Sequence, residues 1–263
     1  MASTSSSTRT NRKEEESLYE TWMNLQREEL TELEQAATQA RNGHINDQEL
    51  TKLIQKITNN FQEYSNNRKR LAQIDAPTFF APISCTPLEN SVLWIGGCRP
   101  SSFIRFIYSL CGIEIESHLT EFFQGTKIGE LSDLTAKQIT MVDELQGKTI
   151  TEERELCSRL SSLQANIVDQ PLPSKLKKDN GDDQGDQYSE NAYERLDEQI
   201  HEMATVVEEA DELRMKTLQE ITSLLTPAQA VEYLAAAKRL RLCFQQWGKK
   251  RDHEHTNKLN SVD

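Results

Sequence analysis

Apolar side chains recur at helical spacing along most of the chain. Leu18, Trp22 and Leu25 stand at positions i, i+4 and i+7, so they share one face of a helix. Further stripes of this kind lie in residues 50–64, 156–167, 196–225 and 240–247. The pattern predicts an all-α fold.

Several helix starts are marked by a threonine that precedes a glutamate or glutamine by three residues. These capping-box sequences are Thr86-Pro87-Leu88-Glu89, Thr226-Pro227-Ala228-Gln229 and Thr135-x-x-Gln138. Proline suits the first helical position, because its missing amide would have no partner there. Asn46 or Asp47 is a further candidate N-cap after the break at Asn42-Gly43. The starts and stripes together predict a multi-helix bundle of about seven to eight helices.

Three segments lack a periodic apolar pattern. Residues 1–15 are rich in Ser and Thr and then charged, and residues 251–263 are polar, so both are predicted to be disordered. Residues 170–188 combine two prolines, two glycines and dense charge, which predicts a solvated linker. The helical domain is therefore expected to span residues 16–250, with the linker inside it.

The composition narrows the classes of function. The net charge of −12 repels nucleic-acid phosphates unless a basic patch overrides it, and the basic clusters hold only three residues each. No run approaches the roughly 18 apolar residues of a membrane span. The five cysteines are scattered and form no C-x-x-C pair, which indicates neither a zinc ribbon nor a disulfide framework. We therefore expect an intracellular protein with reduced thiols and no membrane association.

The stretch LWIGGCRPSSFIRF, residues 93–106, is the least ordinary part of the sequence. It could be a phosphate-binding loop, a reactive thiol loop or a corner between helices. A phosphate-binding loop requires a lysine after its glycines and a strand before them, and the sequence indicates neither. A phosphatase-like thiolate requires its arginine several residues beyond the cysteine, whereas Cys98 and Arg99 are adjacent. We therefore predict a mechanical corner.

The predicted corner follows a helix over residues 88–95, which Gly96 or Gly97 ends in the left-handed conformation. Pro100 enforces the turn, and Ser101 or Ser102 caps the next helix. That helix is expected to end at Gly112. The predicted hinge residues are Gly96, Gly97, Arg99, Pro100 and Ser101.

No set of residues has the pattern of a catalytic or metal site. Cys111 and His118 could form a nucleophile pair, but no acid is placed to orient the histidine. His253 and His255 are two residues apart, which is not the i, i+4 spacing of a helical zinc pair. No carboxylate lies in an apolar run where burial would raise its pKa for acid catalysis. We predict a non-enzymatic protein without catalytic, metal-binding or cofactor-binding residues.

The segment TPLENSVLWIGGCRPSSFIRFIYSLCG, from Thr86 to Gly112, closely resembles the signature of the plant delay-of-germination proteins. The same module forms the C-terminal region of TGA-type bZIP transcription factors. Tyr19-x-x-Trp22, the segment 209–234 and Trp247 agree with the resemblance, which covers residues 16–250. It implies a helical regulator of seed dormancy, germination and abscisic acid signalling in the nucleus or cytoplasm. It also implies clade-A type 2C protein phosphatases as partners.

The sequence departs from the family pattern in two places. In the sequence given, Met1 to Glu16 precede the module, so we expect it to act without the basic region and leucine zipper of the TGA factors. The positions that match the family's haem-ligating histidines hold Arg241 and Gln245, and neither is an ordinary haem ligand. The resemblance therefore carries over no cofactor.

The leading interpretation is a module that binds other proteins. Its candidate partner surface is Leu18, Trp22 and Leu25, unless that stripe is buried within the bundle. One alternative is transcription regulation as a TGA-related factor, by DNA binding or through bZIP partners, although the charge disfavours direct DNA binding. Another is a carrier of haem or an acyl chain. The stripe in residues 196–210 also suits a coiled coil between two copies, so a homo-oligomer is a further alternative.

Overall fold

The computed structural model describes residues 2–112, 133–169 and 184–260, with side chains for residues 12–112, 133–166 and 194–257. The long helices are α1 (Ala2–Arg41), α2 (Asp47–Asp75), α7 (Ala136–Asp169), α8 (Gln184–Leu224) and α9 (Pro227–Asn260). The short helices are α3 (Pro77–Phe80), α4 (Pro87–Asn90) and α5 (Pro100–Leu110). These eight helices, with no strand in the described ranges, confirm the predicted all-α fold.

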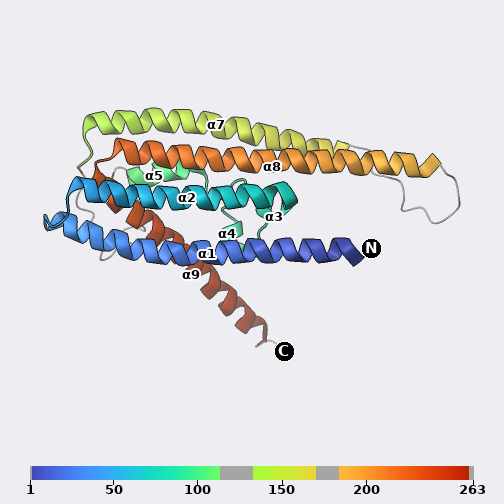
Figure 1. The fold of residues 1–263 in the computed structure, drawn as a ribbon, viewed down its shortest axis with the longest axis horizontal. Helices are drawn as coiled ribbons and strands as arrows, with labels where there is room; N and C mark the ends of the chain where they lie inside the picture. The colour runs from blue at the N-terminus through green and yellow to red at the C-terminus, as the bar shows by residue number, and fades with distance from the viewer. Residues whose placement is uncertain (1, 113–132, 170–183, 261–263) are drawn as a thin grey trace.

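Four long helices lie side by side in the order α7, α8, α2 and α1, and α9 crosses the bundle at an angle (Figure 1). Helix α9 packs mainly on α1 and α2, and its C-terminal end projects away from the other helices. The short helix α5 packs between α7, α8 and α9, while α4 contacts α9. The short helices therefore fill the space that the long helices leave open.

Three apolar clusters hold the described helices together, and the smallest joins Tyr19 and Met23 of α1 to Leu242 of α9. The largest includes Leu33, Ile57 and Ile221, which are almost completely buried. The second packs Phe79 against the α8 face that carries Val207. Each large apolar side chain that is fully buried contributes about 1.5–3 kcal/mol. The stripes seen in the sequence thus supply the main force that assembles the bundle.

The predicted capping box at the start of α4 is present. The Thr86 amide donates to the Glu89 carboxylate at 2.9 Å, and the Glu89 amide donates to Thr86 Oγ1 at 3.3 Å. Asn46, one of the two residues expected to cap α2, is its N-cap and forms the same box with Glu49. Both helices therefore begin where the sequence predicted.

The other two capping boxes are also present, and they are joined to each other. The Thr135 and Thr226 amides donate to the side chains of Gln138 and Gln229 at 3.0 and 2.9 Å. Gln138 Nε2 in turn donates to Gln229 Oε1 at 2.8 Å. The first turns of α7 and α9 are thus fixed side by side.

Both ends of the described chain are more helical than the composition predicts. Helix α1 begins at Ala2 and α9 continues to Asn260, so helices run through residues 2–15 and 251–260, where disorder was expected. Adding a residue to an existing helix costs far less than starting a new one, so packed helices extend into polar flanks. Of the predicted linker, residues 170–183 lie outside the described residues, and α8 begins at Gln184.

Candidate functional site

The segment from Trp94 to Gly97 is a tight β-turn. The Trp94 amide donates to the Gly97 carbonyl at 2.8 Å, and the Gly97 amide donates to the Trp94 carbonyl at 3.1 Å. Ile95 and Gly96 between them have φ values of 43° and 69°, as in the type I′ turns of hairpins. The prediction of a helix over residues 88–95 is therefore wrong, because α4 ends at Asn90. Gly96 is left-handed as expected, but inside a turn and not at a helix end.

Two buried arginines hold this turn through its carbonyl groups. Arg214 of α8 donates to the carbonyls of Ile95 at 2.9 Å and Cys98 at 2.7 Å. Arg68 of α2 donates to the Gly96 carbonyl at 2.9 Å. The arginines thus supply hydrogen-bond donors to carbonyls that lie outside any helix, which stabilises the turn.

Asp211 of α8 links the two arginines. It accepts hydrogen bonds from Arg68 at 2.8 Å and from Arg214 at 2.5 Å, and all three side chains are at most 9% exposed. Burial lowers the pKa of Arg214, against the attraction of Asp211. Burial also acts to lower the pKa of Arg68, but Asp211 and Tyr64 outweigh it and the pKa is raised. We call Arg68, Asp211 and Arg214 the inner triad; two cations and one anion give it a positive charge.

Both hinge glycines lie too close to neighbouring groups for a side chain. A Cβ atom at Gly97 would be 2.8 Å from the Arg214 guanidinium carbon, and one at Gly96 would be 2.7 Å from the Phe79 carbonyl oxygen. The arginine and the turn thus approach each other directly. Gly97 is needed for this contact and does not have a positive φ.

The other hinge residues begin α5, but neither serine is its N-cap. Arg99 is the N-cap residue and makes no side-chain cap, Pro100 is the first helical residue, and Ser101 is the second. Glu153 of α7, which is completely buried, accepts from the Ser101 amide at 2.6 Å and from Arg99 at 2.7 Å. A carboxylate from another helix thus satisfies an orphan amide at the start of α5. Gly112 follows α5 with φ 72°, as predicted for its end.

A cavity of about 210 Å³ lies behind the turn, between α1, α2, α8 and α9. Its wall combines aromatic rings with cations. The rings are Tyr19, Trp22, Phe61, Tyr64, Phe103 and Tyr233, and the cations are Arg68, Arg214, Lys238 and Arg241. The candidate site is therefore internal, and the carboxylates Glu15 and Asp211 lie in the same wall as its cations.

The predicted partner stripe faces this interior. The Trp22 ring stacks on Tyr64 with centroids 4.2 Å apart and an angle of 9°, and Lys238 lies 5.7 Å from its centroid. Leu18 and Leu25 are half-buried. This packing favours the alternative in which the stripe belongs to the bundle, and a role as partner surface stays a prediction.

Two further carboxylates lie close to the cavity. Glu29, 1% exposed, pairs with Lys238, and burial lowers the pKa of that lysine despite the pairing. Glu15, 6% exposed, accepts from Ser84, but its Oε2 atom has no partner among the described residues. Burial raises the pKa of Glu15. The Glu15 end of the cavity therefore lacks one hydrogen-bond donor.

Arg241 and Gln245, which match the family's haem histidines, both have partners. Arg241 forms a salt bridge of 2.8 Å with Glu89, which is 1% exposed. Glu89 also accepts from the Tyr19 hydroxyl at 2.7 Å, and Gln245 donates to the same hydroxyl at 3.1 Å. The pKa of Glu89 is lowered, because hydrogen bonds from Thr86 and Tyr19 outweigh its burial. These two positions therefore connect α9 with α1 and α4.

The chemical groups of the cavity wall are a thiol, cations, carboxylates and aromatic rings. Burial raises the pKa of the Cys85 thiol, which lines the cavity, to about 11, so it is protonated at neutral pH. The cavity wall contains no histidine, and the described ranges hold no group of His, Cys, Asp and Glu suited to a metal ion. His253 and His255 are exposed on α9, and His118 lies outside the described residues. The cavity offers cations and aromatic faces, which suit recognition.

These observations define a class: an all-α bundle whose internal charges are engaged in structural hydrogen bonds. None of its described helices is both long enough and apolar enough to cross a membrane.

Comparison with known proteins identifies the family. The family model described as seed dormancy control, DOG1, matches residues 29–109. Protein DOG1-like 3 of Arabidopsis thaliana is 36% identical over 243 residues, which cover 90% of this chain and 84% of that protein. Protein DOG1-like 1 is 37% identical over 255 residues, which cover 89% of each chain. The chain therefore belongs to the DOG1 family of seed dormancy proteins. Transcription factor TGA6 of Arabidopsis thaliana is more distant, with 23% identity over 230 residues, 86% of this chain and 62% of that factor.

Proposed function

We propose that this protein regulates seed dormancy and germination without catalysis, by binding other proteins. The observation that carries the proposal is the match of residues 29–109 to the family model described as seed dormancy control, and Protein DOG1-like 3 is 36% identical along 90% of the chain. The protonated thiol of Cys85, and the salt bridges that already occupy Arg68, Arg214, Lys238 and Arg241, support a non-enzymatic role.

The finer part of the proposal concerns the pathway. Clade-A type 2C protein phosphatases are its proposed partners, abscisic acid signalling its context, and the nucleus or cytoplasm its location. The family resemblance supports the phosphatases, and the TGA relatives, which are named as transcription factors, support the nucleus.

A binding assay with purified phosphatase tests the proposal. The full chain is immobilised, the phosphatase is titrated, and its activity is measured with and without the chain. Saturable binding is expected, and neither binding nor any change in phosphatase activity would argue against the partner. Trp22→Ala then examines the surface: lost binding with an unchanged melting temperature would place Trp22 in the interface.

A second candidate function is transcription regulation through bZIP partners. The similarity to TGA6 over 86% of the chain favours it. The net charge of −12 opposes binding to DNA alone. An electrophoretic assay on TGA-type sites should show a shift that needs an added bZIP protein. A sequence-specific shift by the chain alone would contradict the indirect mechanism.

A third candidate function, as a carrier of haem or an acyl chain, is favoured by the cavity. Its aromatic wall suits an apolar molecule. An acidic group on the ligand would have to replace one of the carboxylates that already pair with the four cations. The volume of about 210 Å³ is below the range of about 300–1,000 Å³ that is usual for ligand pockets, so binding of haem or an acyl chain requires the helices to separate. Hemin titration followed by absorbance, and displacement of a fluorescent fatty acid, test the two ligands separately. A stoichiometric haem signal lost in Arg241→Ala would place haem at α9.

A further inference from the structure

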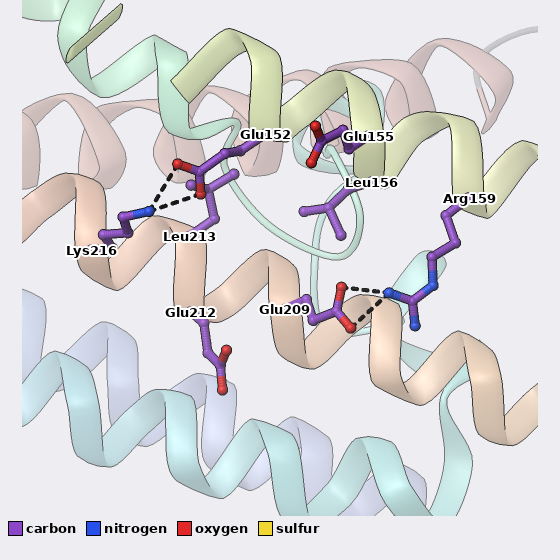
Figure 2. A pocket seen from close by; sticks show the side chains of 8 residues that line it. All are labelled: Glu152, Glu155, Leu156, Arg159, Glu209, Glu212, Leu213 and Lys216. Atoms are coloured by element: carbon purple, nitrogen blue, oxygen red, sulfur yellow. Dashed lines mark hydrogen bonds and ion pairs between the residues drawn. The ribbon is translucent and has the colours of Figure 1, made fainter. Parts of the chain in front are cut away.

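A groove runs between α7 and α8 on the outside of the bundle (Figure 2). Its deeper part has a volume of about 580 Å³ and is lined at i, i+3, i+4 and i+7 on both helices. The lining residues are Glu152, Glu155, Leu156 and Arg159 of α7, and Glu209, Glu212, Leu213 and Lys216 of α8.

A second hollow of about 770 Å³ continues the groove toward the start of α8. On α7 it is lined by Leu163 and Asn166, which follow Arg159 by four and seven residues. On α8 its lining includes Glu198 and Glu202, which precede Glu209 by eleven and seven residues. These spacings keep all of them on the same helix faces, so the hollows form one continuous groove.

The groove is strongly acidic. Eight carboxylates and two cations line it, which leaves −6, half of the net charge of the chain. Lys216 pairs with Glu152, and Arg159 pairs with Glu209 and Glu202. The other five carboxylates form no salt bridge with any described residue; they are Glu155, Glu194, Asp197, Glu198 and Glu212. Of these, Glu212 points away from α7 and attracts Lys69 of α2 (Figure 2). The mutual repulsion of the carboxylates in the groove is relieved when cations bind.

The floor of the groove is apolar, and one buried polar atom in it lacks a partner. Leu156 and Leu213, which also belong to the second apolar cluster, are 8% and 5% exposed, and Leu163 is half-buried. Gln199 lines the second hollow, and its Oε1 atom is buried without a hydrogen bond to any described group. An apolar floor between acidic walls, with an acceptor that needs a donor, is the complement of a helix with leucines flanked by lysines or arginines.

We propose that this groove binds a basic amphipathic helix from another protein. Residues 194–216 of α8 span about 33 Å, which accommodates a helix of about three heptads. The partner's apolar stripe would lie on the leucine floor, and its cations would meet the carboxylates that have no salt bridge. An anionic partner such as a nucleic acid or an acidic membrane is repelled by the same charges. The inference rests on the proposed role as a protein-binding module and names the surface and the chemistry of the partner.

The test uses a labelled peptide of three heptads with leucine at the a and d positions and lysine at the polar positions. Its matched control carries glutamate in place of lysine. Fluorescence anisotropy with the full chain should show binding of the lysine peptide only, weakening as salt is raised. Binding of both peptides, or of neither, would overturn the proposal.

Charge reversal locates the binding. The variant D197K/E198K/E212K should bind the lysine peptide at least about tenfold more weakly. The control E20K/E28K/E63K changes the net charge equally, at exposed positions on α1 and α2, and should change affinity less than about twofold. Equal weakening in both variants would show non-specific attraction and overturn the proposal. Thermal melting checks that both variants fold.

Two other results would overturn the proposal, because each would show a different occupant of the groove. If replacement of Lys175, Lys177 and Lys178 by glutamine tightened peptide binding about tenfold or more, the chain's own lysines would compete for the groove. If sedimentation showed a dimer that D197K/E198K/E212K dissolves, the occupant would be a second copy. Failure of the proposed function is distinguishable, because the wild-type chain would then fail to bind phosphatase or bZIP protein whatever the peptide does.

Discussion

Helix α8 forms arginine–carboxylate salt bridges on two faces, one inside the bundle and one on its surface. On the inside, Asp211 joins Arg68 and Arg214 at 2.8 and 2.5 Å, with all three side chains at most 9% exposed. On the outside, Glu209 meets Arg159 at 2.6 Å, with both side chains 39% exposed. The distances are alike, so distance does not distinguish the two.

Burial distinguishes them. The exposed pair exchanges water for a partner at little gain, whereas a buried charge left alone has neither water nor a counter-ion. The inner triad is therefore fixed in one arrangement that positions the Trp94–Gly97 turn. The outer salt bridge can break at a small cost in free energy, and Glu209 can then pair with a cation of another molecule. On one face of α8 an arginine–carboxylate pair fixes the fold, and on the other face a similar pair can change partners.

The strongest test of this contrast is Asp211→Ala. It leaves two buried arginines without their shared carboxylate, so the free energy of unfolding should fall by about 3–5 kcal/mol. Urea unfolding followed by circular dichroism measures the loss. A loss below about 1 kcal/mol would mean that the triad behaves like a surface pair.

The aromatic wall beside the triad comes next. Trp22→Ala removes a ring stacked on Tyr64 and should cost about 2–3 kcal/mol, below the 3–5 kcal/mol of a fully buried tryptophan, since Trp22 is half-buried. Differential scanning calorimetry gives the shift in melting temperature. An unchanged melt would return Trp22 to the list of partner-binding residues, and Trp22→Phe is the control that keeps an aromatic ring.

The contact between the turn and Arg214 is tested by Gly97→Val beside Cys98→Ser. The valine would overlap the guanidinium and should cost about 1–3 kcal/mol, through crowding rather than through backbone strain. The serine replaces an exposed thiol and should stay within about 0.5 kcal/mol of the wild type. Thermal melts of the two proteins compare them directly, and the opposite ranking would contradict the mechanical role of the turn.

The smallest effect is expected outside. Glu209→Gln removes the exposed pair with Arg159 and should change stability by no more than about 1 kcal/mol. Chemical unfolding in low and high salt checks both the size and the screening. A loss as large as that of Asp211→Ala would erase the distinction between the two sides of α8.

The helices and their starts followed from local rules that act within a few residues. Thr86 with Glu89 and Thr226 with Gln229 are close in sequence, so their pairing can be predicted without knowledge of the fold. The type I′ turn at Ile95 and Gly96 could not be predicted in this way, because Arg68 and Arg214, which donate to its carbonyls, are distant in the chain.

The inner triad left only an indirect signal in the sequence. The heptad of α8 drifts after Ala210, where Asp211 and Arg214 take positions that face the core. Local periodicity treats such charges as exposed, since it contains no information about the partner on α2. Trp22 was ambiguous for the same reason: its stripe suited an interface as well as the bundle, and the ring of Tyr64 is what occupies its face.

The contact between Glu153 and the start of α5 has a consequence for the order of folding. The Ser101 amide finds its acceptor 52 residues later in the chain, on a helix that α5 cannot reach until the long-range packing is in place. Closing a loop of this length costs conformational entropy, and this cost must be met before the contact between Ser101 and Glu153 can stabilise the protein. The first turn of α5 should therefore become protected from hydrogen exchange together with the docking of α7, as one cooperative unit. The protection of the Ser101 amide from exchange would then report when α5 and α7 dock during folding.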